Sequence, residues 1–360
     1  MDATASNPDA AAGACSALHD RLSALSDSSR ASVGAPAVAM SVITSRCGLW
    51  QGASGESSPG VALTNGALFR IGSATKTYVA ALVLQLAQEG KLSLDDTLDR
   101  WSPAYPEAAL ISIRQLLNHT SGAYNFTDDP TFRRELAAHP GRAFGPGELI
   151  GLAAGHPPVF APGETRDGQP RWAYSNTNYL LLGQIIEATT GARIADEIRT
   201  RLLAPLGLEA TFFAGEERIS EPLAHGYTAD NDDITDHYDA GWAWASGAIV
   251  ASSADLAEWA YGLYGGLTLS GESHVVSAAM RDQMLSGWIP MGPGTAYSLG
   301  VMQTDFPTRM IGHRGAFFGY ASQITYLPAQ KSAIAVVANR DGARPEALVV
   351  LAAQIIVNFN

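Results

Sequence analysis

The stretch that decides the fold reads Leu68-Phe-Arg-Ile-Gly-Ser-Ala-Thr-Lys-Thr-Tyr-Val-Ala-Ala-Leu-Val-Leu-Gln-Leu-Ala-Gln-Glu-Gly90. From Thr75 onward its apolar residues recur at helical spacing, and the glycine at its end is a helix stop signal. The pattern predicts a core helix that begins near Gly72. A serine, Ser73, therefore stands at the start of the helix.

This position suits a nucleophilic serine, because the unpaired amides and the dipole of a helix start favour negative charge. Lys76 lies one turn further on the same face, and it accepts the Ser73 proton if burial lowers the lysine pKa. The alternative is a capping serine beside a lysine that reaches solvent. The chain holds only three lysines, and neither Lys91 nor Lys331 follows a serine by three positions.

A second polar motif is Trp172-Ala-Tyr174-Ser-Asn176-Thr-Asn178, which runs into a predicted helix. A tyrosine hydroxyl beside a cationic lysine has a lowered pKa and shuttles a proton. An asparagine amide donates to a substrate carbonyl and accepts from the lysine. The alternative is a helix N-terminus capped by Ser175 or Asn176, with Tyr174 packed under it.

The third motif, Gly312-His313-Arg-Gly315-Ala316-Phe317, ends a predicted strand. Glycines there let a ligand backbone approach closely, and an imidazole donates a hydrogen bond or steadies a proton relay. A structural histidine is the alternative.

The composition is that of a soluble globular protein, with 360 residues, 46% hydrophobic and 16% charged. The net charge of −12 and the absence of a basic run argue against a nucleic-acid partner. No segment has the roughly 18 unbroken apolar residues of a membrane span. The first twenty residues lack the basic start and apolar core of a signal peptide.

The two cysteines, Cys15 and Cys47, allow one pairing. They stand at ends of a predicted helix and strand that become neighbours if the two elements are antiparallel. The sequence leaves two alternatives, a disulfide or two separate buried thiols. A disulfide would indicate an oxidising compartment.

The chain divides into strand-rich ends and a helical middle. Helices are predicted over 16–29, 112–118, 147–154, 177–190, 194–202, 254–265, 276–285 and 344–358. Strands are predicted over 38–43, 48–52, 297–302, 309–313, 320–326 and 332–338.

This order predicts an α/β fold of the α+β type, in which one antiparallel sheet is built from both ends of the chain, flanked by helices, with an all-helical domain inserted. We expect a disordered leader over 1–14, a sheet domain over 15–78 and 286–360, and a helical domain over 79–285.

The three motifs Ser73-x-x-Lys76, Tyr174-x-Asn176 and His313-x-Gly315, in this order, resemble those of the penicillin-recognising serine hydrolases. The similarity is greatest to the branch of class C β-lactamases, Streptomyces-type D-alanyl-D-alanine carboxypeptidases, D-aminopeptidases, D-amino-acid amidases and related esterases. Supporting phrases include Leu116-Leu-Asn-His-Thr-Ser-Gly122 and Ser246-Gly-Ala-Ile-Val-Ala-Ser-Ser-Ala-Asp-Leu256. The resemblance spans residues 35–345 and implies a β-lactamase/transpeptidase-like fold.

The resemblance implies an acyl-enzyme route. Ser73 attacks a carbonyl, and Lys76 and Tyr174 share the roles of base and acid. The backbone amides of Ser73 and Ala316 hold the oxyanion, and Asn176 orients the acyl amide.

Departures from the family pattern bear on the substrate. His313 stands where classical β-lactamases have lysine, which disfavours efficient antibiotic hydrolysis. Ala316 stands where the carboxypeptidase has a hydroxyl residue that helps to bind the terminal carboxylate. Arg314 could meet a substrate carboxylate beside Gly315, unless strand alternation turns it away.

Aromatic residues suggest a pocket for an apolar group. The candidates are Trp242, whose family counterpart lines the cleft, with Tyr124 and Phe126. Ordinary core aromatics are the alternative.

No metal and no cofactor are expected. The acidic run Asp230, Asp232, Asp233, Asp236 and Asp239 lacks the glycine and glutamate of a calcium loop.

The expected activity is that of a serine hydrolase on peptide or amide bonds next to D-amino acids, with β-lactams as acylating inhibitors. Alternatives are a carboxylesterase or acyltransferase that takes ester substrates, and a penicillin-binding module with little turnover. The oligomeric state is open. A periplasmic or secreted location is expected, with a cytoplasmic one as the alternative.

Overall fold

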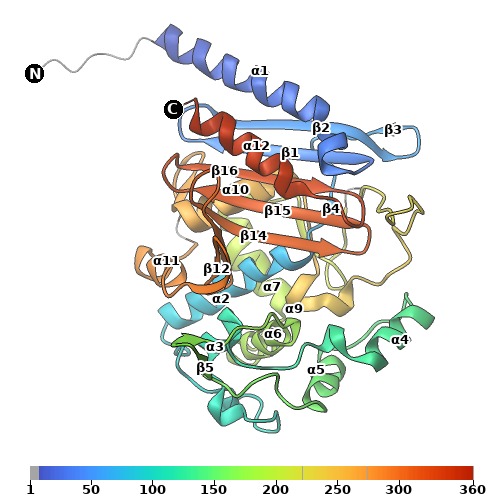
Figure 1. Cartoon of the computed structure of the whole chain (residues 1–360), viewed down its shortest axis with the longest axis vertical. Helices are drawn as coiled ribbons and strands as arrows, with labels where there is room; N and C mark the ends of the chain where they lie inside the picture. The colour runs from blue at the N-terminus through green and yellow to red at the C-terminus, as the bar shows by residue number, and fades with distance from the viewer. Residues whose placement is uncertain (1–7, 221, 274, 360) are drawn as a thin grey trace, which may run out of the picture.

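The fold is a large antiparallel sheet between helices, with a helical region beside it (Figure 1). The computed structural model describes residues 8–220, 222–273 and 275–359. The nine-stranded sheet runs in the order β11 (Ile289–Gly292), β12 (Thr295–Tyr297), β13 (Met302–Thr304), β14 (Met310–Phe317), β15 (Tyr320–Leu327), β16 (Ser332–Ala338), β1 (Ala37–Thr44), β2 (Gly48–Ser58) and β3 (Val61–Ala62). The predicted fold class is confirmed.

The centre of the sheet joins the two ends of the chain. Strands β1 and β16 pair antiparallel, with Ser41 opposite Ala335, and every residue of both strands is buried. Such strands are rich in small and β-branched residues because both faces pack against helices. Helices α1 (Pro8–Val33) and α12 (Pro345–Val357) cover one face, and α10 (Ser253–Gly265) covers the other.

The helical region holds α3 (Ile113–Asn118), α4 (Pro130–Ala138), α5 (Pro146–Ala154), α6 (Asn176–Thr190), α7 (Ile194–Ile198), α8 (Ala204–Leu206) and α9 (Trp244–Gly247). Helix α11 (Ala278–Met284) lies nearer the sheet (Figure 1). Helix α2 (Thr75–Gln88) is almost entirely buried and contacts α6, α7 and α9. The sequence pattern predicts this core helix correctly.

A small three-stranded sheet supports the start of α2. It consists of β4 (Phe69–Arg70), β8 (Ile249–Ala251) and β7 (Thr211–Phe213). Two short hairpins, β5 (Thr165–Arg166) with β6 (Gln169–Pro170) and β9 (Leu267–Thr268) with β10 (Gly271–Glu272), lie in connecting segments.

Two predictions of local structure are wrong. Helix α1 begins at Pro8, so the part of the expected leader over 8–14 is helical, and the rest lies outside the described residues. Alanine-rich sequence favours helix, and proline is tolerated in a first turn. The expected strand over 297–302 is divided instead, because Gly300, with φ +75°, makes a turn between β12 and β13.

The division into domains at residues 78 and 286 remains a prediction. Helix α10 lies inside the range assigned to the helical domain, yet it packs against β1, β15 and β16. It therefore belongs to the layer that covers the sheet.

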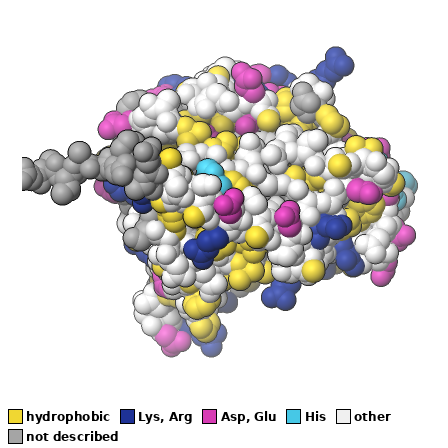
Figure 2. Space-filling model, turned by 90° about the horizontal axis from the view of Figure 1, so that it is seen from above, with side chains coloured by type: hydrophobic (Ala, Val, Ile, Leu, Met, Phe, Trp, Pro, Cys, Tyr) yellow, Lys and Arg dark blue, Asp and Glu magenta, His cyan; other side chains and the backbone are white. Residues whose placement is uncertain are grey.

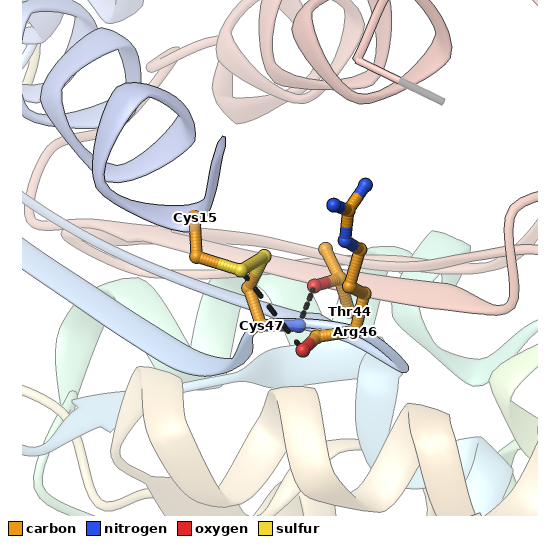
Figure 3. Close-up of a disulfide and its surroundings, with 4 residues drawn as sticks. All are labelled: Cys15, Thr44, Arg46 and Cys47. Atoms are coloured by element: carbon orange, nitrogen blue, oxygen red, sulfur yellow. Dashed lines mark hydrogen bonds between the residues drawn. A yellow bond between two sulfur atoms is a disulfide. The ribbon is translucent and has the colours of Figure 1, made fainter. Parts of the chain in front are cut away.

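A disulfide joins Cys15 in α1 to Cys47 in the turn between β1 and β2 (Figure 3). Of the two possibilities that the sequence leaves open, the structure therefore contains the disulfide. The bond ties the covering helix to the sheet on which it packs.

Charged side chains are dispersed on the face shown in Figure 2, where acidic and basic groups lie among hydrophobic ones. Among the helices that the structure describes, none combines the length and the apolar character needed to cross a bilayer.

We predict that the double variant Cys15→Ala, Cys47→Ala unfolds at a lower urea concentration. The bond closes a loop of sequence separation 32, and its loss should lower the free energy of unfolding by about 3 kcal/mol. Chemical denaturation followed by circular dichroism measures the change. Reduced wild-type protein is the matched control, and equal midpoints for oxidised wild type and the double variant would contradict the prediction.

Candidate active site

Ser73 lies in a short helical turn, Gly72–Ala74, that leads directly into α2. The turn is held from outside, because Ile71 N donates to Ile249 O at 3.0 Å and Ile249 N donates to Thr75 Oγ1 at 3.0 Å. These bonds fix the serine between β8 and the buried helix.

Strand β14 approaches this turn closely because glycines stand on both sides. A Cβ on Gly72, whose φ is +52°, would lie 2.3 Å from Ala316 O and 2.7 Å from Ala316 N. A Cβ on Gly315 would lie 1.8 Å from Ile71 O. The backbone beside Ser73 therefore meets the backbone of Ala316.

Lys76 is fully buried in the first turn of α2. Its Nζ donates to Ser73 Oγ at 3.1 Å, to Asn176 Oδ1 at 2.8 Å and to Ser246 O at 2.7 Å. None of these three acceptors carries a charge, and burial lowers the lysine pKa well below its ordinary value. Burial therefore favours the neutral amine, which is the form that accepts a proton.

Asn176 is oriented by the lysine. Because an ammonium group or amine donates to its Oδ1, the Nδ2 group faces elsewhere, with a long contact of 3.5 Å to Thr127 Oγ1. The backbone N of Asn176 donates to Asn125 Oδ1 at 3.0 Å, which fixes the start of α6. The amide is thus positioned to donate to a bound carbonyl.

Tyr174 lies across from the lysine, with Lys76 Nζ 4.9 Å from its ring centroid. The sequence led us to expect a lowered tyrosine pKa, and this expectation is wrong. Burial raises the pKa of Tyr174 above its ordinary value, and a hydrogen bond with Ser73 lowers it only in part. A neutral phenol that relays a proton fits this environment.

His313 is buried within β14, and both of its ring nitrogens have partners. A carbonyl only accepts, so Nδ1 carries the proton and donates to Arg314 O at 2.5 Å. Nε2 then accepts from the Tyr297 hydroxyl at 2.9 Å. Burial, with the nearby Lys76 charge, lowers the pKa of His313 to about 3 and keeps the ring neutral.

His119 lies behind Tyr174 with its ring centroid 4.4 Å from the tyrosine ring. Its Nδ1 accepts from Ser175 N at 3.3 Å and from Asn178 Nδ2 at 3.1 Å. The sequence marked the phrase that contains His119 but gave this residue no role. It holds the second motif against α3.

A cavity of about 570 Å³ lies over Ser73. Its lining includes Ser73, Tyr174, His313, Arg314, Gly315 and Ala316 from the predicted set, and Trp172, Met291, Tyr297 and Met302 in addition. Arg314 has an exposed side chain and, among the described residues, makes no ion pair. Strand alternation therefore does not remove it from the cavity.

Sequence reasoning missed the apolar wall. Trp172 has a signal, since residues two apart in an extended segment point the same way and Tyr174 follows it by two. No signal in the sequence marks Met291 and Met302, because they come from separate strands at the sheet edge.

The three predicted pocket aromatics do not line this cavity. Trp242 and Phe126 are buried in an aromatic cluster, with 6.2 Å between their ring centroids. Tyr124 stacks on His156 at 4.0 Å. Phe126 and Trp242 are therefore ordinary core aromatics, because their rings pack on other rings.

In the part of the chain that the structure describes, no group of three or more His, Cys, Asp or Glu side chains is arranged to hold a metal ion. The acidic run instead contains an ion pair, in which His225 Nδ1 lies 2.6 Å from Asp233 Oδ2.

The fold and these contacts define a penicillin-recognising serine hydrolase. A family model described as Beta-lactamase matches residues 22–357, and this chain belongs to that family.

Curated relatives include penicillin-binding proteins. Penicillin-binding protein 4 of Amycolatopsis lactamdurans is 30% identical over 308 residues, which are 78% of this chain and 74% of the relative. Penicillin-binding protein 4* of Bacillus subtilis is 26% identical over 82% of this chain, and the match spans 66% of that relative's length.

Similar solved structures are amidohydrolases. The D-stereospecific amidohydrolase of a Streptomyces species has a TM-score of 0.79 at 27% identity, covering 93% of this chain and 97% of its own. The D-amino acid amidase of Ochrobactrum anthropi SV3, in complex with L-phenylalanine amide, has a TM-score of 0.83 at 25% identity, covering 95% and 99%.

We predict that Tyr297→Phe lowers kcat by about tenfold while leaving the fold intact, because a buried nitrogen of His313 loses its only donor. Nitrogen-15 NMR of the histidine rings, assigned with His313→Gln, reports the Nε2 environment directly. Tyr264→Phe is the matched control, since Tyr264 is buried away from the cavity lining. Unchanged kcat together with an unchanged His313 spectrum would contradict this role.

Proposed function

We propose that this protein hydrolyses amide or peptide bonds next to D-amino acids through an acyl-enzyme on Ser73. The observation that carries the proposal is the position of the buried Lys76 amine, whose Nζ lies 3.1 Å from Ser73 Oγ and has only neutral partners. The names of the structural relatives, a D-stereospecific amidohydrolase and a D-amino acid amidase, support this class of substrate.

In the acylation step, neutral Lys76 accepts the Ser73 proton as Oγ attacks the carbonyl carbon. The negative charge that develops on the carbonyl oxygen is held by the amides of Ser73 and Ala316. Loss of one such donor typically costs a few kcal/mol of transition-state stabilisation. The C–N bond then breaks, and the proton returns through Lys76 and Tyr174 to the leaving amine.

In the deacylation step, a water molecule attacks the ester carbonyl. Tyr174 and Lys76 accept the water proton, and the same two amides hold the second oxyanion. Ser73 Oγ leaves with a proton, so the free enzyme and a carboxylic acid result. Asn176 donates to the acyl amide through Nδ2 and keeps the carbonyl in line.

The cavity favours a substrate with an apolar group and a negative charge. Trp172, Tyr297, Met291 and Met302 offer an apolar wall to a side chain. Arg314, without an ion pair among the described residues, offers its guanidinium to a carboxylate.

β-Lactams are proposed as acylating inhibitors, since two of the curated relatives are named as penicillin-binding proteins. The neutral His313 supplies no positive charge to a β-lactam carboxylate. Slow release of the acyl group, rather than efficient hydrolysis, is the expected result.

The disulfide supports a periplasmic or secreted location, because such bonds persist in oxidising compartments.

Replacing the nucleophile gives the first test. Ser73→Ala should reduce hydrolysis of D-amino-acid amides by more than about a thousandfold with an unchanged fold by circular dichroism. Ser45→Ala, in the exposed β1–β2 turn, is the matched control. The substrate panel also contains L-amino-acid amides, acyl-D-Ala-D-Ala, nitrophenyl esters and nitrocefin.

The outcomes of this panel are distinct. Cleavage of nitrophenyl esters with no cleavage of D-amino-acid amides would overturn the substrate class in favour of an esterase. Activity retained in Ser73→Ala would overturn the nucleophile.

The pH dependence gives the second test. Because the lysine must be neutral to accept a proton and its pKa is lowered, kcat/KM should rise with pH and level off below the pH at which an exposed lysine titrates. Tyr174, with a raised pKa, should add no titration in this range. A flat profile from about pH 5 to about pH 9 would contradict Lys76 as the base.

A further inference from the structure

Trp244 has a backbone conformation that residues with a Cβ rarely adopt. Its φ is +38° and its ψ is −128°. Glu107 and His119 also have positive φ, but both lie in the ordinary left-handed region. Since strain of this kind persists only where the surroundings enforce it, the contacts of Trp244 should reveal what enforces it.

The indole of Trp244 is held at both ends. Its Nε1 donates to Glu216 Oε1 at 2.7 Å. Its six-membered ring occupies space left by Gly183 on α6, where an added Cβ would lie 2.6 Å from the ring. The tryptophan is buried, whereas Glu216 is only partly buried.

The strained residue begins the turn that carries the Ser246 carbonyl. Two hydrogen bonds close this turn, from Ser246 Oγ to Ala243 O at 2.6 Å and from Ala248 N to Trp244 O at 2.9 Å. The Ser246 carbonyl oxygen then accepts from Lys76 Nζ at 2.7 Å, the shortest of the three lysine contacts.

We propose that Trp244 and Glu216 are positioning residues, which hold the 243–247 turn so that the Ser246 carbonyl keeps the Lys76 amine on Ser73. Neither side chain needs to touch the substrate. The inference rests on the proposed function, because it takes Lys76 as the base. Two residues outside the three sequence motifs thus explain the position of the lysine.

The chemistry of the pair makes specific variants informative. Trp244→Phe keeps an aromatic ring beside Gly183 but removes the N–H donor. Glu216→Leu removes the acceptor, whereas Glu216→Gln keeps an oxygen acceptor without the charge. Trp101→Phe is the matched control, since it removes an indole bond of 3.1 Å to Thr189 outside the cavity lining.

Lys76 can be observed directly, because the chain has only three lysines. Protein labelled with carbon-13 at lysine Cε should give three resonances, which Lys76→Arg assigns. In the wild type the Lys76 resonance should titrate well below the ordinary range of a lysine, because burial lowers its pKa. A carbonyl acceptor stabilises the charged amine, so its loss in Trp244→Phe and Glu216→Leu should lower the Lys76 pKa further, by about one unit.

Kinetics on a substrate that the wild type hydrolyses supply the second readout. Trp244→Phe and Glu216→Leu should each lower kcat by about tenfold, with KM changed less than about twofold because the substrate is not contacted. The pH profile should shift with the lysine resonance. Glu216→Gln and Trp101→Phe should resemble the wild type in both readouts.

The proposal is overturned if Trp244→Phe and Glu216→Leu leave the Lys76 titration and kcat unchanged, or if Glu216→Gln fails as Glu216→Leu does. A wild type that hydrolyses no member of the substrate panel would refute the proposed function instead. The lysine titration would still decide whether the turn positions the amine.

Discussion

The burial of Lys76 without an anionic partner is the constraint on which this site depends. Lys76 is surrounded by a hydroxyl, an amide and a carbonyl, each of which accepts without adding charge. A carboxylate in any of these places would hold the lysine in its protonated form and disable it as a base. Two neighbouring histidines are affected in the same way. Burial beside this amine lowers the pKa values of His119 and His313 and keeps both rings uncharged.

The site is assembled by segments that have little else in common. The turn before helix α2 supplies the serine and α2 the lysine, the start of α6 supplies the asparagine, and β14 supplies the histidine and the backbone of Ala316. Glycines at 72 and 315 allow two backbones to approach more closely than side chains would permit. In this part of the molecule, the absence of Cβ atoms is as important as the polar groups.

The sequence predicts the sheet and the core helix well, because each depends on local periodicity. The three motifs lie far apart in the chain, and their grouping is expected from the resemblance to a known family. The sequence fails where tertiary packing decides. The aromatic residues Phe126 and Trp242 look suited to a pocket but pack on each other, whereas Trp172 and Met302 meet only through the fold. The direction of the Tyr174 pKa shift could not be predicted either, since burial outweighs the neighbouring charge.

The pairing of β1 with β16 has a consequence for biosynthesis. The central ladder joins Ser41 to Ala335, so the middle of the sheet closes only after residue 335 has left the ribosome. Strand β14 enters with the same late segment. Until that segment is present, Ser73 lacks the backbone of Ala316 that lies opposite it in the folded protein.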